Sequence, residues 1–228
     1  MHNRIAIFGL TGDPFTVAHR EICRKAMDEL PIDKLYVIPT VVTYHREGKE
    51  RCLDDWDRLM CMKHMLWSLG PKYLGMWEID EHEVDLKLLC QNSDDLYDEF
   101  IQNRRFIHTL LDFRCRVGTD LLITLILGTD EAANFKKWYR YKEVLDNIDS
   151  MCIIDGRDGG GVDVIHRMKL DGVDVTPLMM MSDKNLHKVS ASKVRATFKD
   201  GRYAHKEYCE QVDAYDRGEK TLEELKWI

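Results

Sequence analysis

Residues 121–128 read LLITLILG, an apolar run that ends in glycine. A strand that is apolar along its whole length is typical of a parallel sheet whose two faces are both covered by helices. The run is far too short to cross a membrane, so burial inside a folded domain is the natural reason for it. We therefore expect a central strand of an α/β fold here, with Gly128 at its carboxyl end.

Further strand-like and helical segments alternate along the chain. Strand patterns occur at 4–9, 34–40, 73–80, 150–155 and 173–178, and helical patterns at 16–30, 53–69, 105–116, 190–200 and 219–227. This alternation predicts a single α/β domain, built on a Rossmann-like doubly wound parallel sheet of about five or six strands. Residues 82–104 are polar and acidic without a clear period, so we interpret them as an insertion or a partly helical excursion. Residues 190–228 are expected to form a C-terminal helical part.

The composition narrows the class of protein. With 228 residues, of which 44% are hydrophobic and 32% charged, the chain can bury a full core. The formal net charge of −7 disfavours a general nucleic-acid binder, whose surface is usually basic. Neither a signal-peptide pattern nor a membrane-length apolar run occurs, so we expect a cytoplasmic protein with no membrane partner. The seven cysteines include no C-x-x-C pair, which favours free thiols over disulfides or zinc.

The first chemical motif is FGLTGDPFTVAHRE, residues 8–21, between the first predicted strand and helix. Gly9 and Gly12 would let the backbone approach a ligand without an intervening Cβ. The start of the following helix offers unpaired N–H groups and partial positive charge, which suit a phosphate. Thr16 and His19 are three residues apart and would share one helix face. The alternative is an ordinary strand–turn–helix with a surface histidine.

The second motif is HKVSASKVRATFKDG, residues 187–201. Ser190 and Ser192 are residue types that cap helix N-termini, and Arg195 follows one turn later. Two hydroxyls, free N–H groups and a guanidinium at one helix start would make a second anion site. The alternative is a capped helix with a solvated basic face.

Taken together and in this order, the two motifs resemble those of the nucleotidylyltransferase superfamily. The first motif matches at Gly9, Thr11, Asp13, Pro14, Thr16 and His19, and the late motif at Val189, Ser190, Ala191, Ser192 and Arg195. The middle of the chain is similar to bacterial nicotinate mononucleotide adenylyltransferases. The matching residues there are Tyr44, His45, Arg46, Arg58, Leu59, Met60, Thr109, Leu110, Gly128, Asp130, Trp138, Arg140 and Arg157.

The chain departs from that family's pattern at four positions in the first motif. Leu10 replaces a glycine, Gly12 an aromatic residue and Ala18 the glycine before the histidine. Thr16 replaces the first histidine, as in the sister family of pantetheine-phosphate adenylyltransferases. The acceptor therefore stays open between nicotinate mononucleotide, nicotinamide mononucleotide and phosphopantetheine. A nucleotide-binding protein without activity, on a decayed scaffold, is the alternative from another class.

The resemblance implies a reaction in which ATP and a mononucleotide give a dinucleotide and pyrophosphate, as in NAD biosynthesis. Because the attacking phosphate is already ionised, alignment and charge stabilisation would do the work, and His19 need not be a base. Mg²⁺ would arrive with ATP, and no metal site made by the protein is expected. No nucleic-acid partner is expected, and a homo-oligomer stays open.

The resemblance also implies roles for individual residues. The catalytic residues would be His19, Thr16 and Arg195. The ATP-binding residues would be Gly9, Leu10, Thr11, Thr16, His19, Gly128, Asp130, Ser190, Ser192 and Arg195. The mononucleotide-binding residues would be Thr40, Tyr44, His45, Arg46, Thr109, Trp138, Arg140 and Arg157. Two of these have structural alternatives: Trp138 could be a core residue, and Asp130 could be a helix N-cap.

Overall fold

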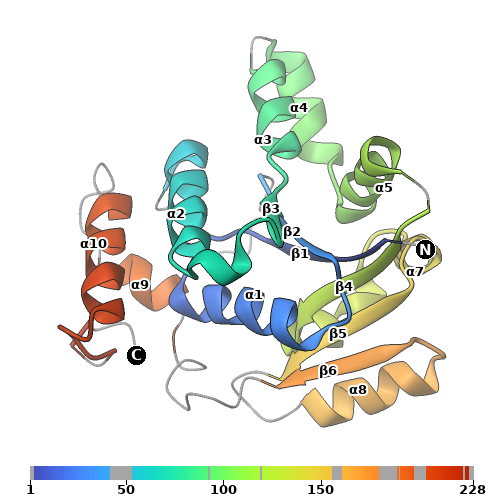
Figure 1. Cartoon of the computed structure of the whole chain (residues 1–228). Helices are drawn as coiled ribbons and strands as arrows, with labels where there is room; N and C mark the ends of the chain where they lie inside the picture. The colour runs from blue at the N-terminus through green and yellow to red at the C-terminus, as the bar shows by residue number, and fades with distance from the viewer. Residues whose placement is uncertain are drawn as a thin grey trace.

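A six-stranded, fully parallel sheet forms the centre of the protein (Figure 1). The computed structural model describes residues 3–41, 53–91, 93–118, 120–155, 161–179, 189, 191–197, 204–222 and 224–225. The strands are β1 (Arg4–Leu10), β2 (Lys34–Pro39), β3 (Trp77–Ile79), β4 (Leu122–Gly128), β5 (Ser150–Asp155) and β6 (Val175–Met179). Their order across the sheet is β3-β2-β1-β4-β5-β6, which is the doubly wound arrangement predicted from the sequence.

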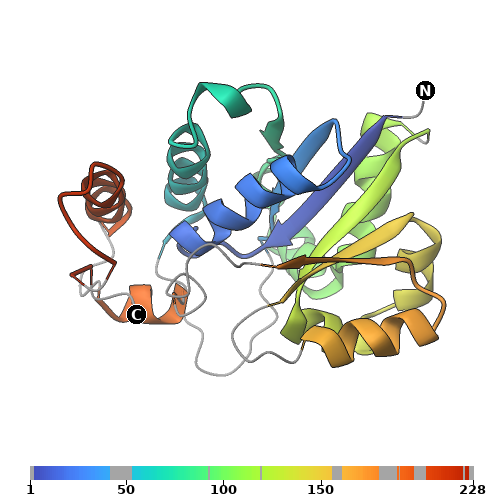
Figure 2. The ribbon, with the colours of Figure 1, turned by 60° about the horizontal axis from the view of Figure 1, so that its bottom comes forward.

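Helices cover both faces of the sheet (Figure 2). One face packs against α1 (Val17–Glu29), α2 (Asp55–Trp67), α9 (Ala191–Thr197) and α10 (Ala204–Asp216). The other face packs against α5 (Phe106–Val117), α6 (Thr129–Ala133), α7 (Tyr141–Asp146), α8 (Gly161–Leu170) and the short 3₁₀ turn η2 (Phe135–Lys137). The strands therefore bury both of their faces, which is why the segment at 121–128 is apolar apart from Thr124.

The alternation of side chains along β1 shows this double burial directly. Ala6 and Phe8 belong to the core beneath α1 and α2, whereas Ile5 and Ile7 belong to the core beneath α5. Successive residues of a strand point to opposite faces, so a strand buried on both sides needs apolar residues at every position.

The segment 82–104 is mostly helical, in agreement with the expectation of a partly helical excursion. It forms α3 (His82–Cys90) and α4 (Asp94–Asn103), which contact each other and stand above the sheet in Figure 1. A small separate core beneath them contains Val41, Leu59 and Val84. Since only this narrow seam is buried, most of the segment can be polar, and its sequence shows no clear period.

Three sequence expectations about the elements need correction. The predicted helix at 219–227 is wrong for its described residues, because 217–222 and 224–225 form turns and α10 lies earlier, at 204–216. The helix α8 was not expected at all. The strand expected at 73–80 is shortened to β3, because the 3₁₀ turn η1 (Pro71–Tyr73) and the positive φ of Gly75 (82°) bend the chain before it.

In the described part of the chain, no helix is both long and apolar enough to span a membrane.

Candidate nucleotide-binding site

The candidate site lies where the sheet reverses its winding direction. β1 pairs with β2 on one side and β4 on the other, so the loops that leave β1 and β4 diverge at this point. In doubly wound sheets, the crevice outside the carboxyl ends of such strands is where ligands bind. The loop after β1 leads directly into α1, and in both views α9 lies beside the start of that helix (Figures 1 and 2). The two sequence motifs therefore meet at one edge of the sheet.

Thr16 and His19 are bonded to each other at the start of α1. Thr16 is the N-cap, and its Oγ1 accepts the His19 backbone N–H at 3.4 Å. In return, His19 Nδ1 accepts the Thr16 backbone N–H at 2.9 Å and lies 3.1 Å from Thr16 Oγ1. This is a capping box with histidine in place of the usual Glu or Gln. Because Nδ1 is an acceptor, the neutral imidazole carries its proton on Nε2.

The surroundings of the two side chains differ. The His19 ring is half-buried and packs against Phe15 at 5.4 Å and Phe8 at 6.3 Å between ring centroids. Thr16 is only 1% exposed. We expected both side chains to point at one ligand, but the Thr16 hydroxyl is directed at His19 instead. The reason is that Thr16 caps the helix, so its hydroxyl points back at the first turn.

The glycines of the first loop face protein atoms. Gly12 is buried with φ +57°, and a Cβ built on it would overlap Met62 Cε, well inside the 3.0 Å that real Cβ contacts keep. A Cβ on Gly9 would lie 3.3 Å from Phe106 Cε2. These contacts give Gly9 and Gly12 a packing role in addition to the ligand approach expected from the sequence. Gly12 is required by backbone conformation and by internal packing against α2.

A buried arginine joins the loops after β1 and β2. Arg58 is 1% exposed, and its guanidinium donates to the carbonyl oxygens of Thr11 and Thr40 and to Asp55 Oδ1. The Thr40 N–H also donates to the Leu10 carbonyl at 3.0 Å. Sequence analysis matched Arg58 to a motif but gave it no role. Nothing in the local sequence marks an arginine as buried, because its acceptors come from loops 18 and 47 residues away.

The late motif reaches the first loop through Arg195. Its guanidinium donates to the Asp13 carbonyl and, at 2.9 Å, to Ser192 Oγ one turn earlier in α9. Arg195 is half-buried, whereas Ser192 is exposed. Ser190, which sequence analysis placed in the same anion site, lies outside the described residues. The fold thus brings together two motifs that stand at opposite ends of the sequence.

The carboxyl end of β4 forms a third part of the candidate site. Gly128 is the N-cap of α6, so the alternative reading of Asp130 as the N-cap is wrong. Asp130 is exposed in the first turn, and a Cβ on Gly128 would lie 2.9 Å from its Oδ1. Gly128 therefore keeps space for this carboxylate. Thr129 Oγ1 donates to the Ile154 carbonyl at 2.8 Å and joins the ends of β4 and β5.

Aromatic side chains border this edge on the α5 side. The half-buried Trp138 packs edge-on against Phe106, with ring centroids 5.3 Å apart and an interplanar angle of 65°. It also contacts the buried Phe135 at 5.1 Å. Phe106 in turn faces Gly9. Phe106 was missed by sequence analysis, although an aromatic residue at the start of the helix that carries Thr109 was a usable signal.

The other residues predicted to bind the mononucleotide differ in their burial and contacts. Thr109 is 4% exposed, and its hydroxyl donates to Glu83, so the predicted direct contact with a ligand is not favoured by its position. Arg140 is exposed, has φ 54° and forms an ion pair with Glu143. Its guanidinium is therefore held at the surface by its own helix. Tyr44, His45, Arg46 and Arg157 lie outside the described residues.

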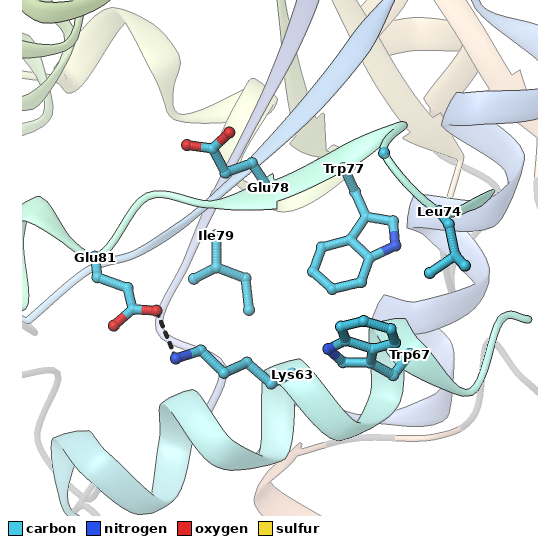
Figure 3. Close-up of a pocket in the computed structure, with 8 residues that line it drawn as sticks. Lys63, Trp67, Leu74, Trp77, Glu78, Ile79 and Glu81 are labelled. Atoms are coloured by element: carbon cyan, nitrogen blue, oxygen red, sulfur yellow. Dashed lines mark ion pairs between the residues drawn. The ribbon is translucent and has the colours of Figure 1, made fainter. Parts of the chain in front are cut away.

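Cys152 of β5 is buried beneath the helices of the first face of the sheet. Burial raises the pKa of the Cys152 thiol to about 12, which keeps it protonated and unreactive. Among the residues the structure describes, no three His, Cys, Asp or Glu side chains converge as metal ligands. A cavity of about 350 Å³ between α2 and β3 is lined by residues such as Trp67 and Trp77 (Figure 3). None of the predicted site residues lines it.

A parallel sheet with this strand order, and a helix start at its switch point, defines the class of nucleotide-binding α/β proteins. A family model described as cytidylyltransferase-like matches residues 7–197, and the chain belongs to this family. The resemblance to nucleotidylyltransferases inferred from the sequence is thereby confirmed.

Two relatives of this chain carry the same name. The chain is 25% identical over 219 residues to a "Probable nicotinate-nucleotide adenylyltransferase" from Aliarcobacter butzleri, covering 96% of this chain and all of that protein. It is 31% identical over 138 residues to a protein of the same name from Campylobacter fetus, covering 60% of this chain and 64% of the relative.

A solved structure shows the same fold. Nicotinic acid mononucleotide adenylyltransferase from Plasmodium falciparum, complexed with NaAD, superimposes with a TM-score of 0.65 at 14% identity. The match covers 97% of this chain and all of that one. At this identity the likeness concerns the fold alone, and it confirms the doubly wound sheet predicted from the sequence.

Proposed function

We propose that this protein transfers the AMP moiety of ATP to nicotinate mononucleotide, releasing pyrophosphate. The observation that carries the proposal is the bond between Arg195 and the Asp13 carbonyl, which unites the late motif with the first loop in one site. Family membership and the names of the relatives support the same reaction. The product would be a dinucleotide used in NAD biosynthesis.

The chemistry requires charge stabilisation more than proton transfer. A phosphate oxygen of the mononucleotide forms a bond to the α-phosphorus of ATP, and the bond from that phosphorus to the oxygen that bridges the α- and β-phosphates breaks, so that this oxygen leaves with pyrophosphate. The nucleophile is ionised at neutral pH, so no side chain has to deprotonate it. A donor aimed at the α-phosphate lowers the barrier by stabilising charge that develops in the transition state.

His19 is suited to be that donor. Its Nδ1 accepts the Thr16 N–H, which leaves Nε2–H as the donating end of the neutral ring. Phe8 and Phe15 restrict the ring orientation, so little freedom is lost when a phosphate binds. We assign Thr16 a supporting role instead of direct contact, since its hydroxyl is directed at His19. A threonine can perform this role where a second histidine is absent.

The two substrates would bind at opposite ends of the site. Ser192 and Arg195 would bind the β- and γ-phosphates, because a guanidinium can bridge two phosphate oxygens in its planar fork. On the other side, Trp138 would stack on the pyridine ring, extending the aromatic contacts it already makes with Phe106. Asp130 would contact ribose hydroxyls.

ATP would enter with Mg²⁺. Since no described group of His, Cys, Asp or Glu side chains forms a metal cage, the phosphate oxygens would supply most ligands. The ion would offset negative charge on the triphosphate. The residues named above do the remaining work of alignment.

The test is a product assay with purified protein, ATP and Mg²⁺, run in parallel with nicotinate mononucleotide, nicotinamide mononucleotide and phosphopantetheine. Pyrophosphate and a dinucleotide should form fastest with nicotinate mononucleotide. His19→Ala should lower kcat by about 10²-fold or more, the scale for one lost transition-state donor. His166→Ala, which removes an exposed histidine on α8, is the matched control and should leave kcat unchanged.

Three results would contradict the proposal. Turnover of phosphopantetheine alone would assign the protein to the sister activity. ATP binding without pyrophosphate release for any acceptor would indicate a non-enzymatic relative. An unchanged kcat in His19→Ala would remove this histidine from the mechanism.

A further inference from the structure

A buried carboxylate connects the segment 82–104 to the candidate site. Glu83, in the first turn of α3, is 3% exposed. Its Oε2 accepts the Val41 backbone N–H at 3.2 Å, and its Oε1 accepts the Thr109 hydroxyl and Arg104 Nε, the latter at 3.4 Å. One side chain thus contacts the exit of β2, the end of α4 and the first turn of α5.

The peptide group whose N–H donates to Glu83 also forms a hydrogen bond through its carbonyl. Thr40 and Val41 share one peptide unit, whose N–H donates to Glu83 and whose carbonyl accepts Arg58 Nη2 at 2.8 Å. Both side chains are almost completely buried. We call this arrangement of Glu83, Arg58 and the Thr40–Val41 peptide the peptide clamp.

The charges of the clamp fix one orientation of the peptide. A peptide unit has a dipole with its positive end at N–H and its negative end at the carbonyl. Here the carboxylate faces N–H and the guanidinium faces the carbonyl. A flipped peptide would place like charges together in a buried setting, where electrostatic interactions are strong. The clamp therefore specifies a single direction for the chain at Thr40.

A second contact from α3 supports the guanidinium side. Lys87 lies four residues after Glu83, on the same helix face, and forms an ion pair with Asp55 Oδ2. Asp55 Oδ1 in turn accepts Arg58 Nη1 at 2.7 Å. Both halves of the clamp thus depend on α3, which explains why a helix of the segment 82–104 carries buried charges.

We propose that Glu83 is a positioning residue for the acceptor half of the site, acting through the peptide clamp on Thr40. This rests on the proposed function, together with the expectation from the sequence that Thr40 binds the mononucleotide. ATP is bound by the first loop, α1 and α9, none of which Glu83 contacts in the hydrogen bonds described above. Loss of the Glu83 charge should therefore affect the acceptor more than ATP.

The test compares Glu83→Gln with wild type in steady-state kinetics and in amide hydrogen exchange. A glutamine cannot accept from both Val41 and Arg104, because one end of its amide is a donor. We expect the KM for nicotinate mononucleotide to rise about tenfold or more, the scale for one lost hydrogen bond to a charged group. The KM for ATP should change less than about twofold, and the Val41 amide should exchange faster.

Two controls separate positioning from general damage. Glu81→Gln removes a partly exposed carboxylate of the same helix, paired with Lys63 at 2.7 Å, and should change neither KM. Glu83→Asp keeps the charge on a shorter side chain and should restore part of the acceptor affinity. If Glu83→Gln does not fold by circular dichroism, Glu83→Asp carries the comparison.

The outcomes distinguish this proposal from the proposed function. Equal increases in both KM values, or unchanged protection of the Val41 amide, would overturn the positioning role while the activity stands. If wild type does not use nicotinate mononucleotide, the proposed function fails. In that case faster exchange at Val41 in Glu83→Gln still supports the clamp, and unchanged exchange overturns it.

Discussion

Gly12 is the position in the first loop where substitution should cost most stability, and Gly12→Ala is the perturbation we predict in detail. The residue is buried between β1 and α1 with φ +57°, a conformation that L-residues avoid. Its missing Cβ would overlap Met62 Cε, and Met62 is completely buried. Alanine therefore meets both a backbone and a packing penalty at this site.

The two penalties can be estimated separately. The left-handed conformation costs an alanine about 1–2 kcal/mol. The Met62 methyl is the end of a flexible side chain, but it has to move within a filled core, and such overpacking costs about 1–3 kcal/mol. Together they predict a loss of about 2–5 kcal/mol in the free energy of unfolding. For a chain of this length, the melting temperature should fall by at least about 4 °C.

The assay is denaturant and thermal unfolding of Gly12→Ala beside two matched glycine variants. Gly172→Ala has φ +81° and no atom within 4 Å of the new Cβ, so it should show the backbone penalty alone, about 1–2 kcal/mol. Gly9→Ala lacks a positive φ and meets only Phe106 at 3.3 Å, so it should cost less than Gly12→Ala.

A double-mutant cycle isolates the packing penalty. Met62→Ala removes the methyl that obstructs the new Cβ, so the double variant Gly12→Ala with Met62→Ala should be more stable than the two single losses predict. We expect a coupling of about 1 kcal/mol or more for such a contact. Equal losses for Gly12→Ala and Gly172→Ala would refute the overlap with Met62. Losses below about 0.5 kcal/mol in both would refute the backbone argument as well.

Three further predictions concern the site and the cysteines. Arg58→Met should lower the free energy of unfolding by about 1–3 kcal/mol, because the Thr11 and Thr40 carbonyls lose their buried donor while Asp55 keeps Lys87; a loss below about 1 kcal/mol in denaturant unfolding would contradict this. Trp138→Ala should weaken mononucleotide binding by about 1–3 kcal/mol with little change in the KM for ATP, whereas equal losses for both substrates would mark a structural tryptophan. The exposed Cys115 should react with a thiol reagent at pH 8 in the folded protein, whereas Cys152, whose pKa is raised to about 12 by burial, should react only after unfolding. Mass spectrometry of the labelled peptides measures this difference, and early labelling of Cys152 would show that its thiol is accessible in the folded protein.

Local sequence patterns predicted most of the fold because each central element carries its own signal. The run at 121–128 is apolar apart from Thr124, since both faces of β4 are buried. The order of strands and helices then restricts the topology to a doubly wound sheet. The same reasoning failed at α10, which packs on α2, and its apolar face is defined by that partner and not by a clear period of its own.

The candidate site was predicted in its motifs but not in its geometry. The residue types of the two motifs pointed to phosphate binding, and the fold brings Arg195 to the first loop as expected. Thr16 caps α1, which the sequence did not predict, because a capping interaction depends on the exact residue at which the helix begins. Thr109 was assigned to the acceptor, whereas its hydroxyl donates to a buried carboxylate of α3.

The sequence alone determined the class of fold and the family resemblance, since periodicity and short motifs depend on neighbours along the chain. Only the tertiary structure decided which charged residues are buried. Arg58 and Glu83 look like ordinary helix-surface residues in the sequence, and their common peptide at Thr40–Val41 lies 18 and 42 residues away from them. A buried charge is stable only where folding supplies its partners, and those partners come from segments that the sequence does not place side by side.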